Sequence, residues 1–178
     1  MPLRLLGRPA LATALMVMLV APAGAEQKPS GQTKPNQIVN GLAVAMSGDT
    51  VTVGGTSVRL FGIAAPFAGE TCETRFGKIY DCYRKSTDVL QALIGGNEVS
   101  CEITASDRNG QKIGICRVGG TDLSAAMVAR GWAFAYRRLT PAYASSEAFA
   151  ESHRLGMWGG RVEMPWQWKS RKLSDTAK

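Results

Sequence analysis

The stretch from Ser47 to Phe67, SGDTVTVGGTSVRLFGIAAPF, most constrains what this chain can fold into. Residues Thr50 to Val53 favour a strand, Gly54-Gly55 is a two-residue turn signal, and Ser57 to Ile63 resumes a β-rich run. The stretch therefore predicts a β-hairpin early in the fold.

The first 25 residues have the organisation of an export signal. Arg4 and Arg8 precede the apolar run 10–20, and Ala23-Gly24-Ala25 offers a small-residue cleavage site. The apolar run is shorter than the ~20 residues that a membrane helix needs. We therefore expect a signal peptide at 1–25 and a periplasmic or secreted protein, with an uncleaved N-terminal anchor as the alternative.

The rest of the 178-residue chain is long enough for one domain with a proper core and too short for two. Residues 26–37 are rich in Lys, Pro, Gln, Ser and Gly, which predicts a flexible leader. We expect the folded domain at 38–169 and a basic tail at 170–178.

The net charge is +7 for the whole chain and +5 without the export signal, because that segment contains two arginines and no acid. A mildly basic surface favours nucleic acid or another polyanion as a partner. Net charge affects encounter and solubility, and it does not define a fold or a reaction.

All the cysteines follow the export signal, so an oxidising compartment favours two disulfides among Cys72, Cys82, Cys101 and Cys116. Three pairings are open. Cys101 and Cys116 are equidistant from the turn 107–110 and would face each other in a regular hairpin, which favours Cys101–Cys116 with Cys72–Cys82. A zinc site is the alternative, although no CxxC pair is present and the only histidine, His153, is far away in the sequence.

The remaining pattern predicts strands before helices. Residues 38–46 form a first strand, and a second hairpin spans 98–105 and 111–118 around the turn DRNG. Helices are expected at 81–94, 123–131 and 143–155, and residues 67–80 are expected to form a surface loop. This order predicts a β-rich α+β fold, a five-stranded OB-type barrel with about three helices.

Several motifs resemble the staphylococcal nuclease (thermonuclease) family. Gly48-Asp49-Thr50, Val58-Arg59-Leu60 and Gly62-Ile63 before Ala65-Pro66 are similar to its DGDT, VRL and GIDAPE segments. The turn DRNG resembles its DRYGR, and PWQWK at 165–169 resembles the PWEWR tail of secreted members. The resemblance covers nearly the whole chain after the leader and implies the same OB-type barrel.

The family's site contains two calcium-binding aspartates, a glutamate that orients water, and two arginines that grip the phosphate. By resemblance, Asp49 matches the first metal-binding aspartate and Arg59 the first phosphate arginine. The other three positions are replaced, by Ala64, Phe67 and Gln111. With one aspartate left, the resemblance implies at most a weak Ca²⁺ site and leaves open whether the protein is an enzyme.

Each of these residues has a second interpretation. Asp49 and Arg59 can form a cross-strand ion pair that fixes the hairpin. Glu70 can substitute for the missing carboxylate if its loop is rearranged, or it is a solvated loop acid like Glu73. Phe67 is either a packing residue or a stacking surface beside Arg59.

Further along the chain, Trp158, Trp166 and Trp168 are interpreted first as packing residues, and His153 as a solvated or packing side chain. Arg137-Arg138 is interpreted as a solvated face, with contact to a polyanion as the alternative.

Three function hypotheses follow. The first is an exported nuclease-like protein that lacks efficient calcium-dependent phosphodiesterase activity and acts as a binding or accessory protein. The second is a weak or rebuilt nuclease that hydrolyses DNA or RNA with Asp49, Arg59 and Glu70. The third is an accessory protein of succinoglycan-type exopolysaccharide biosynthesis with an oligosaccharide ligand, which the resemblance admits because secreted nuclease-like proteins occur among such genes.

Overall fold

A computed structural model describes residues 37–161 and 163–167. The expected signal peptide, all but the last residue of the expected leader, the expected tail 170–178 and Trp168 lie outside the described residues.

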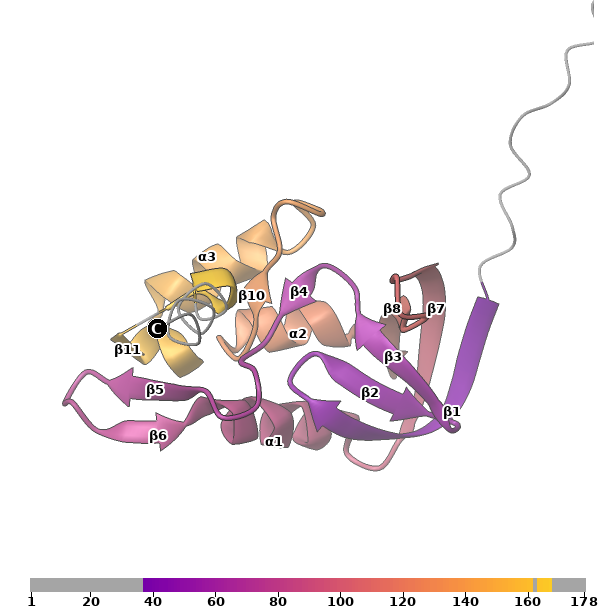
Figure 1. Ribbon diagram of the computed structural model, residues 1–178, viewed down its shortest axis with the longest axis horizontal. Helices are drawn as coiled ribbons and strands as arrows, with labels where there is room; N and C mark the ends of the chain where they lie inside the picture. The colour runs from indigo at the N-terminus through magenta and orange to yellow at the C-terminus, as the bar shows by residue number, and fades with distance from the viewer. Residues whose placement is uncertain (1–36, 162, 168–178) are drawn as a thin grey trace, which may run out of the picture. The chain divides into compact units, whose positions relative to one another are not determined.

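The centre of the domain is a closed five-stranded barrel (Figure 1). Its strands are β1 (Gln37–Ser47), β2 (Thr50–Val53), β3 (Thr56–Leu60), β7 (Glu98–Ser106) and β8 (Lys112–Val118). Neighbouring strands are antiparallel except β3 and β8, which pair in parallel from Val58 opposite Lys112 and close the barrel. The predicted OB-type α+β fold is confirmed.

The predicted first hairpin is formed by β2 and β3 around Gly54 and Gly55. Both glycines have positive φ, 52° and 82°, which is the combination a two-residue type I′ turn requires. The turn sets the register in which Thr50 lies opposite Arg59. This register places Arg59 next to Asp49.

The described residues include three bounded α-helices, α1 (Cys82–Ile94), α2 (Leu123–Ala129) and α3 (Ala144–Ser152), followed by a 3-10 turn, η1 (Gly156–Gly159). Asp81 and Asp122 cap α1 and α2 by accepting backbone N–H bonds. The third helix is shorter than predicted because Arg154 and Gly156 have positive φ, which turns the chain out of the helix. Within the described ranges, no helix has the length and apolar character needed to cross a membrane.

The expectation of a loop without secondary structure at 67–80 is wrong. This segment contains β5 (Thr71–Thr74) and β6 (Ile79–Asp81), which pair as a hairpin, and β11 (Gly160–Arg161) adds to β5. Strands this short leave little periodicity to detect in a sequence. The same holds for the two-residue strands β4 (Ile63–Ala64), β9 (Thr121–Asp122) and β10 (Phe134–Ala135).

Two apolar clusters hold these elements together. The larger one fills the barrel, where alternate residues of each strand point inward and meet α1 and α2; it includes Val51, Val53, Val58, Leu60, Leu90, Ile94, Val99, Leu123 and Met127. The smaller cluster joins Cys72 and Cys82 to Phe134 and Met157. Tyr143 lies at the edge of the larger cluster, and burial and the Asp122 carboxylate raise the pKa of its phenol.

Both predicted disulfides are present. Cys101 and Cys116 lie directly opposite each other in β7 and β8, with Cα atoms 4.0 Å apart. Cys72 in β5 is bonded to Cys82 at the start of α1, with Cα atoms 5.5 Å apart. One bridge therefore lies inside the barrel, and the other ties the β5–β6 hairpin to α1.

Replacing both Cys101 and Cys116 by alanine should lower the free energy of unfolding by about 3 kcal/mol, because the bridge closes a loop of 15 residues. Urea unfolding of the oxidised proteins measures this loss. The matched control is the double alanine variant of Cys72 and Cys82. It keeps the Cys101–Cys116 bridge, so reductant should still lower its unfolding midpoint. An unchanged unfolding midpoint for the first variant would contradict a barrel disulfide in solution.

Candidate functional site

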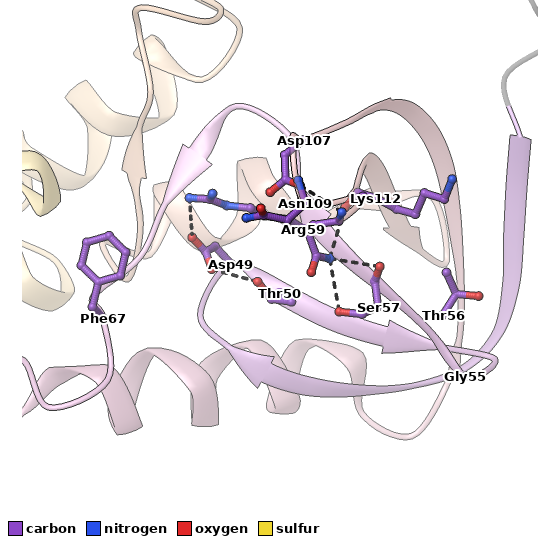
Figure 2. A pocket seen from close by; sticks show the side chains of 12 residues that line it. Asp49, Thr50, Gly55, Thr56, Ser57, Arg59, Phe67, Asp107, Asn109 and Lys112 are labelled. Carbon is purple, nitrogen blue, oxygen red and sulfur yellow. Dashed lines mark hydrogen bonds and ion pairs between the residues drawn. The ribbon is translucent and has the colours of Figure 1, made fainter.

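A polar cavity of about 810 Å³ lies beside the β2–β3 hairpin (Figure 2). Its walls come from the beginning of β2, from β3 and its turn, and from the turn between β7 and β8; the lining residues include Asp49, Thr50, Ser57, Arg59, Phe67, Asp107, Asn109, Gln111 and Lys112. The closing pair β3–β8 brings these two turns together.

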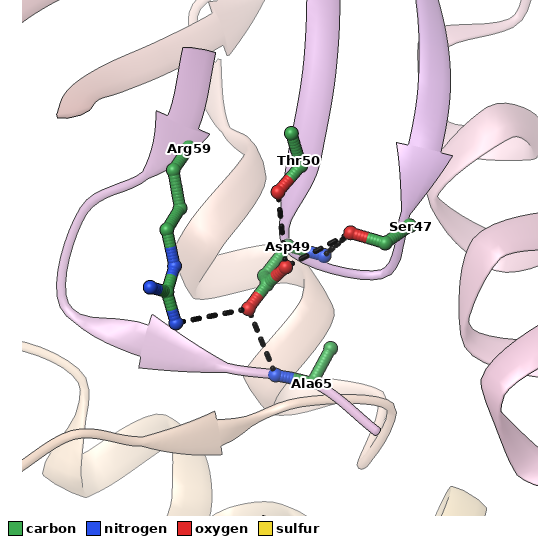
Figure 3. A network of polar contacts seen from close by, with 5 residues as sticks. All are labelled: Ser47, Asp49, Thr50, Arg59 and Ala65. Carbon is green, nitrogen blue, oxygen red and sulfur yellow. Dashed lines mark hydrogen bonds and ion pairs between the residues drawn. The ribbon is translucent and has the colours of Figure 1, made fainter. Parts of the chain in front are cut away.

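Asp49 is the most constrained residue of this cavity (Figure 3). Its Oδ1 accepts hydrogen bonds from the hydroxyls of Ser47 at 2.9 Å and Thr50 at 3.1 Å. Its Oδ2 accepts the backbone N–H of Ala65 at 3.3 Å and lies 3.6 Å from the Arg59 guanidinium. Both oxygens are therefore committed to the protein's own donors.

The backbone around Asp49 is equally fixed. Gly48 packs so closely on Ser86 of α1 and on Ala65 that a Cβ at position 48 has no room. The Leu60 N–H donates to the Asp49 carbonyl at 2.8 Å. Gly48 thus lets the hairpin lie against α1, and the Asp49 side chain follows from that placement.

The ion pair anticipated between Asp49 and Arg59 is present. The Arg59 side chain is 42% exposed, so solvent weakens the pair. The remaining guanidinium donors of Arg59 are available to a ligand in the cavity, and Figure 2 shows the side chain between Asp49 and the Asp107–Lys112 turn.

The two replaced positions that line this cavity differ in chemistry from the residues they replace. Gln111 Nε2 donates to the carbonyl and hydroxyl oxygens of Ser57, at 3.1 Å and 3.2 Å. The turn that carries Gln111 is held by Asp107, whose Oδ1 accepts two backbone N–H bonds. Phe67 is 41% exposed and lies at one end of the cavity in Figure 2.

Ala64, at the third replaced position, is buried in β4 opposite Phe134 and does not line the polar cavity. Its methyl group brings no oxygen toward Asp49. The carboxylates that do line the cavity are Asp49 and Asp107, and Asp107 is engaged in its turn. Within the described residues, no three His, Cys, Asp or Glu side chains gather in a way that could hold a metal ion.

Glu70 differs from the expectation of a solvated loop acid. It is only 4% exposed, and it is not one of the residues that line the polar cavity. Its backbone N–H bonds to the Phe67 carbonyl at 2.9 Å in a tight turn. Glu73 is paired with Arg161 at 3.7 Å and is partly exposed.

Some lining residues were missed by sequence reasoning, namely Asn109 and Lys112 beside Gln111, and the hydroxyls of Thr56 and Ser57. The signal available was their position next to the two turns DRNG and GG, but nothing in a single sequence indicates that those turns meet.

The interpretation of the tryptophans as packing residues has a mixed outcome. Trp158 packs edge-on against Phe134, with ring centroids 5.5 Å apart, whereas Trp166 is 45% exposed.

Comparison with known proteins gives one family and two relatives. The family model described as staphylococcal nuclease homologue matches residues 57–160. The chain is 30% identical over 128 residues to "Succinoglycan biosynthesis protein ExoI" of Rhizobium meliloti (strain 1021), covering 69% of this chain and 66% of that protein, just under two thirds of its length. It is 27% identical over 135 residues to an "Uncharacterized endonuclease" of Escherichia coli O157:H7, covering 71% of this chain and 82% of that protein.

Replacing Asp49 by alanine should lower the free energy of unfolding by about 1–3 kcal/mol, because the buried Ala65 N–H and two hydroxyls lose their acceptor. Replacing Arg59 by alanine should cost about 1 kcal/mol or less, since its pair is solvent-exposed. Urea unfolding in calcium-free buffer measures both. A stability gain in the Asp49 variant would instead indicate a carboxylate kept for a cation.

Proposed function

This chain belongs to the staphylococcal nuclease homologue family, and from that premise we propose that it is an exported binding or accessory protein without efficient calcium-dependent phosphodiesterase activity. Family membership suggests nucleic-acid binding, and the basic net charge supports a polyanion partner. The chemistry of the polar cavity differs from the calcium site that the family resemblance implies.

The observation that carries the proposal is the isolation of Asp49, a single carboxylate that already accepts three hydrogen bonds from the protein and faces the Arg59 cation. A Ca²⁺ ion takes about six to eight oxygen ligands, usually with several carboxylates. Oδ1 of Asp49 already accepts two hydroxyls, Oδ2 accepts one N–H and faces the Arg59 cation, and Ala64 supplies no second carboxylate. The residues present therefore do not fit a tight calcium site.

The other two replacements remove the remaining catalytic functions. Phe67 cannot take a proton from water, and a positioned base is typically worth ~10² to 10⁴ in rate. Gln111 carries no charge and is bonded to Ser57, whereas an arginine that stabilises a phosphoryl transition state can be worth ~10³ to 10⁵. These losses do not multiply simply, but each is large enough to disable hydrolysis.

Binding does not need the lost groups. Arg59, Lys112 and Asn109 offer hydrogen-bond donors around the cavity, and Phe67 offers an exposed ring at its end. A ligand with oxygen acceptors and a flat face can be held there without being cleaved. This is the role that we assign to the polar cavity.

Export is part of the proposal. The N-terminal pattern of charge, apolar run and small residues supports a signal peptide, and two disulfides support an oxidising compartment. A periplasmic or secreted location fits both observations.

A second candidate function is an accessory part in exopolysaccharide biosynthesis. The observation that favours it is the likeness to a protein whose name refers to succinoglycan biosynthesis. Deleting the gene should then reduce the mass of exported polysaccharide, and the Asp49→Asn variant, which keeps an acceptor for the hairpin, should restore it. Unchanged polysaccharide in the deletion strain would rule this function out.

The third candidate is a weak nuclease that uses Glu70, and the relative named as an endonuclease favours it. The placement of Glu70 disfavours it, because the side chain is buried and does not line the polar cavity. Loss of any measured activity in Glu70→Gln, with Glu73→Gln as the exposed control, would support this candidate over the first.

The protein without residues 1–25 should not digest single-stranded DNA or RNA in millimolar Ca²⁺ above the level of Asp49→Ala. Combining Ala64→Asp, Phe67→Glu and Gln111→Arg should install hydrolysis, which adding Asp49→Ala to the same variant should abolish. Release of acid-soluble nucleotides measures all four proteins. Calcium-dependent digestion by the unaltered chain, abolished by Asp49→Ala, would refute the proposal.

A further inference from the structure

Three neighbouring cavities, of which the polar cavity is the first, make up the surface that we call the groove. A second cavity of about 290 Å³ shares Arg59 and Phe67 with the polar cavity, and is otherwise mostly apolar. A third cavity of about 530 Å³ shares Tyr136 and Trp166 with the second. The three cavities therefore adjoin through shared walls.

Exposed aromatic rings stand at both junctions of this groove. Phe67 is 41% exposed at the first, and at the second Tyr136 and Trp166 are 38% and 45% exposed, with ring centroids 6.4 Å apart. Exposed aromatic side chains that line cavities commonly provide flat contact surfaces for ligand rings. Exposed rings at both junctions offer more than one contact surface, which favours a chain of rings over a single small molecule.

The charges that line the groove cancel. Asp49 and Asp107 offset Arg59 and Lys112 in the first cavity, and Glu147 and Glu151 offset Arg137 and Arg138 in the third. Grooves for single-stranded nucleic acid are instead strongly positive, because the strand carries one phosphate charge per nucleotide. The local charge balance therefore disfavours a polyanion in spite of the chain's positive net charge.

The third cavity is built for hydrogen bonding. Glu147 is 4% exposed and accepts the Ala135 N–H at 2.8 Å through Oε1, while Oε2 holds the Arg137 guanidinium at 2.8 Å. This bond fixes Arg137, and 57% of its side chain stays exposed, so its other donors can reach a ligand. Trp158 Nε1, in the wall of the same cavity, is a buried donor with no acceptor within the described residues.

We propose that this groove binds a linear, largely uncharged oligosaccharide, with sugar rings against Phe67, Tyr136 and Trp166 and hydroxyl groups bonded to the exposed guanidinium groups of Arg59 and Arg137. Sugar rings present apolar C–H faces to aromatic rings and hydroxyl edges to planar acid, amide and guanidinium groups. OB-type barrels serve oligosaccharides as well as nucleic acids. The inference rests on the proposed binding role and names the ligand class.

The test is isothermal titration of the protein without residues 1–25 with the disaccharides and hexasaccharides of cellulose, maltose and laminarin. At least one hexasaccharide should bind, and more tightly than its disaccharide, because only the longer chain spans neighbouring cavities. Affinity should change little between 50 and 300 mM NaCl, since no counterions are released. Failure of every hexasaccharide to bind at millimolar concentration would overturn the inference.

Matched variants locate the binding. Trp166→Ala should weaken the binding of the hexasaccharide by about fivefold or more, and Trp166→Phe should retain most of the affinity. Phe149→Ala is the control, because Phe149 is an exposed ring on α3 outside the groove. Unfolding curves confirm that each variant is folded; equal effects of Trp166→Ala and Phe149→Ala would contradict a groove site.

Nucleic acid is the competing occupant, and it is tested with (dT)₈ in the same titration. Tighter binding of (dT)₈ than of any hexasaccharide, with a steep loss in salt, would overturn the oligosaccharide assignment and leave the proposed binding role intact. Calcium-dependent cleavage of a longer DNA strand would instead refute the proposed function, so the two failures are distinguishable.

Discussion

The Asp49 carboxylate holds together the part of the domain on which the cavity depends. It joins the end of β1 through Ser47, the start of β2 through Thr50, β3 through Arg59 and the segment after β4 through Ala65. A buried acceptor that satisfies this many donors is expensive to remove, because each abandoned N–H or O–H must be desolvated without a partner. The same bonds that stabilise the hairpin occupy the oxygens that a cation would need. The contacts that fix the hairpin and a bound cation would therefore need the same carboxylate oxygens. In this chain both oxygens contact donors of the protein itself.

Much of the fold could be predicted from the sequence because its determinants are local. The Gly54-Gly55 turn, the alternation in β2 and β3, and the equal spacing of Cys101 and Cys116 from their turn all act within one hairpin. The β5–β6 hairpin was not predictable, since three or four residues give no usable period and its partner β11 lies far away along the chain. Glu70 illustrates another limit: a carboxylate in a polar loop looks solvated until the packing around the Cys72–Cys82 bridge is known.

The candidate site was predictable only in part. The resemblance placed Asp49, Arg59 and the three replaced positions, but whether those residues act in catalysis stays a prediction. It could not reveal the neighbouring cavity, because Tyr136 and Trp166 come from segments after the barrel that line this cavity together with β4. Phe67 at the position where the resemblance expects a glutamate also has a structural effect, since its ring is a shared wall of two cavities. Loss of one function and gain of a binding surface can thus arise from the same residue.

The parallel pairing of β3 with β8 also has a kinetic consequence. Three pairs of barrel neighbours are joined in hairpins, whereas β1 meets β7 and β3 meets β8 only after the long segments between them have been placed, as in the pairs Leu42–Glu98 and Val58–Lys112. Contacts between residues distant in sequence form late, because the chain loses the entropy of closing a long loop before the contact adds any stabilising free energy. The Cys101–Cys116 bridge, in contrast, needs only its own hairpin. Oxidation needs only the β7–β8 hairpin, so this ribbon can be fixed covalently before the contacts that close the barrel form.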